Sequence, residues 1–200
     1  MISGIVLAGG KNSRMLGEDK AFLKINGQLI ISRILDIFKD IFGEIWIITN
    51  SPERYGPLKG GKVFVARDLI SEGGPLAGIY TGLKYMNNEA GFFVACDMPN
   101  LHIGLIKRQL TLFLKGRYEC LAPVHKGLVE PLHAVYTKPL APRIYSFLKE
   151  KGGSVKGFLK DCQCRFIEVG EEEIVSFSNL NSIDDIKGSK EIAGKIESLD

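Results

Sequence analysis

The sequence predicts an α/β fold, a single Rossmann-like domain of three layers with helices on both faces of a mostly parallel sheet. Short apolar runs of strand composition alternate with amphipathic helical stretches along most of the chain, which is typical of parallel strand–helix–strand units. No low-complexity linker interrupts this order, and 200 residues suffice for one ordinary domain. The expected domain covers residues 1–200, with a polar tail from about residue 183.

The individual elements follow from apolar spacing and from glycine or proline at their ends. The apolar run over 3–7 ends in glycines and indicates a buried strand, whereas apolar residues recur at helical spacing over 28–42. Pro75 is acceptable in the first turn of the helix that follows it. The remaining predicted elements are strands over 44–49, 62–66, 92–96, 120–124, 132–136 and 165–169, helices over 76–86, 103–114, 140–148 and 155–159, and a weakly helical tail over 183–199.

Composition and charge limit the function classes. The chain has 45% hydrophobic and 24% charged residues, typical of a globular protein, and its net charge of +3 gives no argument for nucleic acid. We find neither a signal peptide nor an apolar stretch of membrane-spanning length. The four cysteines lack both zinc-site spacing and the density of a disulfide framework. We therefore expect a cytoplasmic protein with reduced thiols and without nucleic-acid or membrane partners.

Polar and glycine residues follow the predicted strands at their carboxyl ends. Ligands of open α/β sheets bind outside these ends, so the segments are expected to meet at one edge. The residues concerned are Leu7, Ala8, Gly9, Gly10, Asn50, Asp68 and Asp97.

The glycine loop after the first strand matches neither common phosphate-binding template. Gly4 and Gly9 have P-loop spacing, but Gly10 stands where the P-loop lysine belongs, and the dinucleotide fingerprint is absent. Gly9 and Gly10 permit close approach of the main chain to a ligand, and Arg14 and Lys20 supply positive charge for phosphates. The alternative is a tight turn followed by a solvated basic loop.

Asp97 ends a continuous apolar strand and precedes Met98 and Pro99, which fix the turn. A carboxylate facing a phosphate site is a natural ligand of Mg²⁺, which proteins hold with one or two carboxylates and substrate phosphates. The structural alternative is an N-cap for the helix that starts near His102.

Other segments carry weaker indications. The stretch SEGGPLAGI over 71–79 offers either a helix N-terminus for an anion or close helix-to-sheet packing through Gly78 and Gly82. His133, in EPLHAVY, is interpreted as a satisfied core residue rather than a base. Asn179 and Asn181 either reach into the cleft or belong with Ser182 and Asp185 to a helix cap.

Together these motifs resemble the molybdenum cofactor guanylyltransferases, which belong to the nucleoside-triphosphate nucleotidyltransferases. The resemblance covers nearly the whole chain in the family's order and rests on L-A-G-G-x-x-S-R-M, D-K, G-P-L-A-G-I, C-D-M-P, E-P-L-x-A-x-Y and N-x-N. Two positions depart from the family. Lys156 stands where members often carry an arginine near the pterin, and Ser182-Ile183-Asp184 replaces the usual threonine-proline-glutamate.

The resemblance implies transfer of GMP from GTP to molybdenum-molybdopterin, with release of pyrophosphate. It implies Mg²⁺ on Asp97, activity residues Arg14 and Lys20, and pterin-side residues Lys156, Asn179 and Asn181, and it admits a handoff to molybdenum-insertion proteins or molybdoenzymes. The implied GTP-binding residues are Leu7, Ala8, Gly9, Gly10, Lys20, Asn50, Asp68 and Asp97.

Three alternatives to this function stay open. They are a related nucleotidyltransferase that uses CTP or another acceptor, a dehydrogenase, and a non-catalytic nucleotide-binding protein. The missing dinucleotide fingerprint argues against the dehydrogenase.

Overall fold

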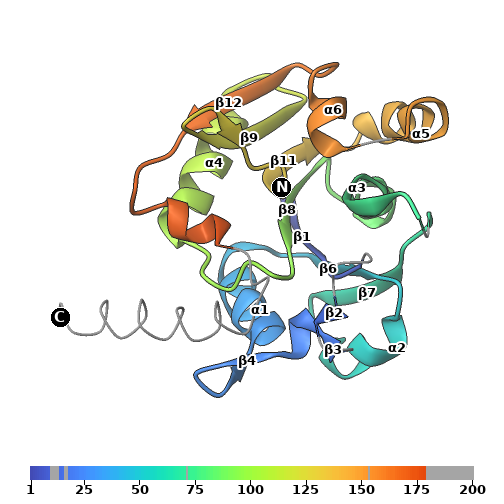
Figure 1. Cartoon of the computed structure of the whole chain (residues 1–200), viewed down its shortest axis with the longest axis vertical. Helices are drawn as coiled ribbons and strands as arrows, with labels where there is room; N and C mark the ends of the chain where they lie inside the picture. Colours follow the sequence, from blue (N-terminus) through green and yellow to red (C-terminus); the bar gives the residue numbers. More distant parts are fainter. Residues whose placement is uncertain (10–13, 16–17, 71, 153, 179–200) are drawn as a thin grey trace.

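The computed structural model describes residues 1–9, 14–15, 18–70, 72–152 and 154–178, and of residues 14, 15 and 18 only the main chain (Figure 1). The strands are β1 (Ile2–Leu7), β2 (Arg14–Met15), β3 (Glu18–Asp19), β4 (Lys24–Ile25), β5 (Gln28–Leu29), β6 (Ile45–Thr49), β7 (Val63–Arg67), β8 (Ala90–Ala95), β9 (Cys120–His125), β10 (Leu128–Val129), β11 (His133–Thr137) and β12 (Cys164–Glu168). The α-helices are α1 (Ile30–Ile41), α2 (Pro52–Tyr55), α3 (Gly74–Tyr85), α4 (Ile103–Lys115), α5 (Leu140–Glu150) and α6 (Val155–Leu159), and the 3-10 helices are η2 (Lys20–Phe22), η3 (Gly56–Leu58) and η4 (Ile174–Phe177).

One mixed sheet of eight strands forms the centre of the fold. Its order is β10-β9-β11-β8-β1-β6-β7, and β12 pairs with β9. Strands β8, β1, β6 and β7 run parallel to one another, with Ile5 of β1 opposite Phe93 on one side and Trp46 on the other. Strand β11 pairs antiparallel with both β8 and β9. The predicted α/β class with a mostly parallel sheet is confirmed.

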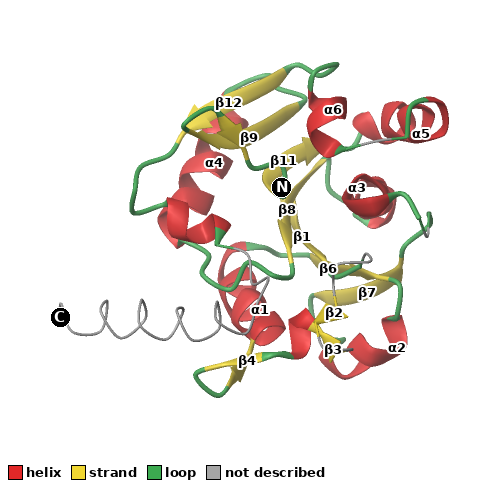
Figure 2. Cartoon of the chain, in the orientation of Figure 1, coloured by secondary structure: helices red, strands yellow, loops and turns green. Residues whose placement is uncertain are grey.

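Helices cover both faces of the sheet, as Figure 2 shows: α1 and α4 lie on one face and α3, α5 and α6 on the other. Helix α1 turns Ile30, Ile34 and Phe38 inward, as its helical spacing predicts. Phe92 and Phe93, neighbours on β8, belong to the cores on opposite faces because adjacent strand residues alternate in direction. Among the described helices, none is sufficiently long and apolar to traverse a bilayer.

Two tight hairpins were not predicted from the sequence. Asn26 and Gly27, between β4 and β5, have φ values of 51° and 81°. Lys126 and Gly127, between β9 and β10, have φ values of 49° and 78°. Two successive residues with positive φ are the mark of the type I′ turn, whose twist matches that of paired strands. The Asn-Gly pair is thus a hairpin signal that the sequence already contained.

Candidate functional site

The predicted site residues that the structure describes gather along one edge of the sheet. Because β8, β1, β6 and β7 are neighbours in this order and run in the same direction, their carboxyl ends are aligned. Asp97, Ala8, Asn50 and Asp68, which follow these strands, therefore lie in that spatial order. With strands about 4.8 Å apart, this part of the edge is about 14 Å long.

Main-chain hydrogen bonds extend this alignment beyond the strands. The amide of Cys96 donates to the carbonyl of Leu7 at 3.0 Å, and the amide of Ala8 donates to Ile48 at 2.8 Å. The amide of Asp68 donates to Thr49 at 3.0 Å. The bends that follow the strands are thus anchored to their neighbours, and the edge is a continuous surface.

Gly9 lies directly against Asn50. A Cβ atom at Gly9 would stand 3.4 Å from Asn50 Nδ2 and 3.6 Å from its main-chain nitrogen. A side chain there would thus occupy the space beside the Asn50 amide. Arg67 donates to the carbonyl oxygen of Asn50 and pairs with Glu53 at 3.3 Å, which fixes the turn after β6.

Lys20 and Asp97 form an ion pair at the β8 end of this row. Lys20 Nζ lies 3.5 Å from Asp97 Oδ2, and the two side chains are 5% and 22% exposed. Lys20 opens η2, whose N-cap is the buried Asp19. The cation and the carboxylate predicted for phosphate and metal are therefore adjacent, although they lie 77 residues apart in the chain.

Asp68 lies at the far end of the edge, where α3 begins. Its Oδ1 accepts hydrogen bonds from Thr81 Oγ1 at 2.6 Å and from the amide of Ile70 at 3.2 Å. Burial raises the pKa of Asp68, and these hydrogen bonds oppose the rise. Gly78 lets α3 pack closely on Leu7, because a Cβ there would lie 3.0 Å from Leu7 Cδ2, and it borders Asp68 Oδ2, which would be 3.8 Å away.

Glu130 is a site residue that the sequence analysis did not place at this edge. Strand β11 runs antiparallel to β8, and the carbonyl of Leu132 accepts from the amide of Ala95 at 3.1 Å, so the residues just before β11 lie beside Asp97. Burial raises the pKa of Glu130, the charge of Lys156 lowers it, and that of Asp97 raises it further. In a parallel strand the same residue would lie at the opposite edge.

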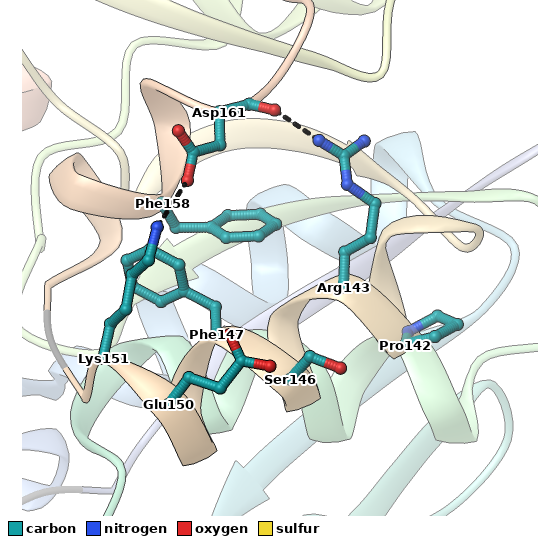
Figure 3. A pocket seen from close by; sticks show the side chains of 8 residues that line it. All are labelled: Pro142, Arg143, Ser146, Phe147, Glu150, Lys151, Phe158 and Asp161. Atoms are coloured by element: carbon teal, nitrogen blue, oxygen red, sulfur yellow. Dashed lines mark hydrogen bonds and ion pairs between the residues drawn. The ribbon is translucent and has the colours of Figure 1, made fainter.

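Lys156 belongs to α6. One ion pair and one hydrogen bond join the residue just after α6 to α5 and the residue that follows it (Figure 3). Asp161, just after α6, pairs with Lys151 Nζ at 3.6 Å, and its carbonyl accepts from Arg143. A groove of about 330 Å³ lies beside these contacts, with Phe147 and Phe158 among its lining residues. Of the predicted site residues that the structure describes, none lines this groove.

The donor set at the edge fits a metal ion shared with a ligand better than a closed metal centre. Within the described part of the chain, no three His, Cys, Asp or Glu side chains are arranged to hold a metal. Asp97, with a side chain that is 22% exposed, supplies a carboxylate oxygen that can reach a ligand at this edge. This matches Mg²⁺, which is commonly bound by one or two carboxylates and completes its coordination with phosphates and water.

Several sequence-based expectations have other outcomes. The N-cap of α4 is His102, whose Nδ1 accepts from the amide of Leu105 at 3.1 Å, so Asp97 does not cap this helix. His133 is fully buried, as expected, but contrary to expectation it is not satisfied by hydrogen bonds, because neither ring nitrogen has a partner among the described residues. Gly82 packs against the sheet, where a Cβ would lie 2.7 Å from Phe93. The side chains of Arg14, Gly10, Asn179, Asn181, Ser182 and Asp185 fall outside the described residues.

Comparisons with known proteins show the family and the fold of this chain. Residues 4–164 match the model of the MobA-like NTP transferase domain. A probable molybdenum cofactor guanylyltransferase from Natranaerobius thermophilus is 33% identical, over 98% of each chain. Another from Clostridium perfringens is 36% identical, over 92% of this chain and 93% of the relative. The fold is similar to that of molybdopterin-guanine dinucleotide biosynthesis protein A from Archaeoglobus fulgidus, with a TM-score of 0.82 at 22% identity over 97% and 100% of the two chains.

Proposed function

Because the chain belongs to the MobA-like NTP transferase family, we propose that it transfers GMP from GTP to molybdenum-bound molybdopterin, which yields the guanine dinucleotide cofactor and pyrophosphate. The names of the relatives that match nearly the full chain support this substrate pair. The observation that carries the proposal is the Lys20–Asp97 ion pair beside the loop after β1, where a triphosphate needs both positive charge and a metal ligand.

The reaction is an in-line displacement at phosphorus. An oxygen of the terminal phosphate of the pterin forms a bond to the α-phosphorus of GTP, while the bond from this phosphorus to the bridging β-oxygen breaks and pyrophosphate leaves. A phosphate oxygen is ionised at neutral pH, so this chain needs to supply positioning and charge neutralisation rather than a nucleophile or a base.

The GTP side of this proposal is the loop of Leu7 to Gly10 with Asn50 and Asp68. The main chain of Gly9 and the Asn50 amide lie side by side, so both can contact the same base or ribose from one side. Arg14 and Lys20 offset charge on the triphosphate and on the leaving pyrophosphate.

Asp97 would hold Mg²⁺ together with the phosphates of GTP. When bound, the metal ion supplies charge neutralisation at the reacting phosphates. Lys20, 3.5 Å from the same carboxylate, keeps that carboxylate oriented toward the nucleotide.

The acceptor side comprises Lys156, Asn179 and Asn181. Lys156 contributes a mobile positive charge for a phosphate, in place of a bidentate arginine. The charge of Lys156 lowers the pKa of Glu130 and that of Asp97 raises it, so both side chains act on this carboxyl group. This supports an acceptor position at the β8–β11 end of the edge. We further propose that residues 1–200 act as one domain in the cytoplasm, where free thiols such as those of Cys120 and Cys162 stay reduced.

The test is pyrophosphate release from the purified protein supplied with molybdenum-molybdopterin, Mg²⁺ and either GTP or CTP. We expect release with GTP, and calorimetry should detect GTP binding far more readily than CTP binding. Release with CTP alone would assign the related cytidylyl activity. Nucleotide binding without release in either mixture would instead indicate a non-catalytic nucleotide-binding protein.

A further inference from the structure

Asp19 is a buried carboxylate with both oxygens engaged. Its Oδ1 accepts from the amide of Ala21 at 3.1 Å, and its Oδ2 accepts from Tyr55 Oη at 2.6 Å. Only 5% of the residue is exposed. A buried carboxylate is costly unless it is hydrogen-bonded or paired, so these contacts are required to keep it in place.

Tyr55 reaches this carboxylate from a distant part of the chain. It ends α2, which follows Asn50 by a single residue, and it is fully buried. Its ring packs on Phe22 of η2, with ring centroids 4.8 Å apart. Burial raises the pKa of Tyr55, so the phenol stays protonated and donates its hydrogen to Asp19. Tyr55 thus joins the segment after β6 to the segment that carries Lys20.

The Tyr55–Asp19 contact belongs to a group of three charged side chains, Asp19, Lys20 and Asp97. Asp19 precedes Lys20 in the sequence, and the Lys20 ammonium faces Asp97 at 3.5 Å. All three act on the buried thiol of Cys96, whose pKa is raised by burial, Asp97 and Asp19 and lowered by Lys20. Lys20 and the two carboxylates therefore all lie near this thiol. Of the two carboxylates, Asp19 is engaged by Tyr55 and Ala21, and Asp97 belongs to the candidate site.

We propose that Tyr55 and Asp19 are positioning residues for the transfer reaction. The Tyr55 hydroxyl holds the Asp19 carboxylate in place, and the Asp19 cap holds the η2 backbone from which Lys20 extends toward Asp97. The inference rests on the proposed function of Lys20, because Tyr55 and Asp19 are buried and act through Lys20. Removal of the hydroxyl takes a donor from the buried carboxylate and loosens the cap, which moves Lys20 relative to Asp97.

The first arm of the test is kinetic and uses a double-mutant cycle. Tyr55→Phe should lower kcat about 10-fold, because misplacement of a charged group by a fraction of an ångström to an ångström is costly in transfer reactions. In a Lys20→Met background, Tyr55→Phe should have no further effect on kcat. An equal loss in both backgrounds would mean that Tyr55 acts independently of Lys20, which overturns the proposal.

Tyr136→Phe is the matched control. Tyr136 is also fully buried and donates to a main-chain carbonyl, that of Pro131, at 2.8 Å. Its loss removes a buried tyrosine hydrogen bond without changing the surroundings of Lys20. A fall in kcat of the same size in Tyr136→Phe would indicate a general loss of stability and would count against a positioning role.

The second arm does not depend on turnover. The ¹⁵Nζ signal of Lys20, assigned by its disappearance in Lys20→Met, should shift in Tyr55→Phe and stay in place in Tyr136→Phe. An unchanged Lys20 signal in Tyr55→Phe refutes the proposal. If the native protein releases no pyrophosphate while the signal still shifts, the proposed function fails and the positioning contact stands.

Discussion

The buried polar groups compared on the two sides of β8 differ in whether they have hydrogen-bond or ion-pair partners. On the side that carries β1 and β6, Asp19, Lys20 and Tyr55 are buried and joined by hydrogen bonds or an ion pair. On the side that carries β11, the buried His133 ring and Gln109 Oε1 have no hydrogen-bond partner among the described residues. The first side therefore maintains buried charge, whereas the second side holds buried groups that are neutral.

The physical cost of burial explains this difference. A buried charge is tolerated only with partners, and the alternation of Asp19, Lys20 and Asp97 supplies them. His133 avoids the cost in another way. It lies between the rings of Phe92 and Phe177, with ring centroids 5.1 and 5.4 Å away, and burial lowers its pKa to about 4. The comparison teaches that a buried charge is maintained by its partners, whereas a buried ring without hydrogen-bond partners stays neutral.

The largest expected effect on kcat comes from a substitution in the Lys20–Asp97 ion pair. Asp97→Asn keeps the size of the side chain and removes its charge, so we expect kcat to fall about 100-fold or more through loss of the metal ligand. The matched control is Asp36→Asn, on the exposed face of α1. Pyrophosphate release measured at saturating GTP and Mg²⁺ gives the comparison. A near-normal rate for Asp97→Asn would remove this residue from the mechanism.

The buried, neutral His133 on the β11 side should make the stability of the folded protein sensitive to acid. The unfolded chain binds a proton on His133 near pH 6.5 and the folded protein near pH 4, so the unfolded state binds more protons between these values. Stability contributed by the neutral ring is therefore present above pH 6.5 and lost as the pH falls toward 4. The loss amounts to about 3 kcal/mol in the free energy of unfolding.

Urea unfolding of the native protein and of His133→Leu at pH 7 and pH 4.5 measures this contribution. The native protein should lose more stability than the variant on acidification, because leucine takes up no proton. Parallel losses in the two proteins would show that His133 does not carry the acid sensitivity.

The charged side was largely predictable because its residues stand at strand ends. Leu7, Asn50, Asp68 and Asp97 each follow an apolar run, and the rule that ligands bind at the carboxyl edge of a parallel sheet brings them together. Tyr55 could not be found in this way. Its hydroxyl meets Asp19 across 36 residues, and nothing in the local pattern distinguishes it from an ordinary core tyrosine.

The other side was less predictable because strand direction is not encoded in apolar spacing. An alternating βα pattern favours parallel strands, which would put the start of β11 at the amino edge. The structure pairs β11 antiparallel with β8, so Glu130 arrives beside Asp97. The same reversal leaves His133 in the core opposite Val94. A polar residue before a strand can thus change edges when one strand is inverted.

The smallest predicted effect is that of Lys156 on binding of the pterin, at the acceptor end of the edge. Lys156 is exposed on α6, and its charge lowers the pKa of Glu130 against the effect of burial. Lys156→Ala should raise KM for the pterin about 3-fold and leave KM for GTP unchanged, because an exposed cation contributes a weak, screened attraction. The control is Lys160→Ala, at the other end of the same helix.

Salt separates an electrostatic contribution from a structural one in this experiment. The difference in pterin KM between native protein and Lys156→Ala should shrink as ionic strength rises from 0.01 to 1 M, since the screening length falls from about 30 Å to about 3 Å. A difference that persists at high salt would mean that Lys156 supports the α6 backbone rather than the acceptor phosphate. An equal change in the KM for the pterin in Lys160→Ala would mean that the attraction comes from both lysines and not from Lys156 alone. The protein would then recognise the acceptor through diffuse charge, unlike GTP, which the fixed Lys20–Asp97 ion pair contacts.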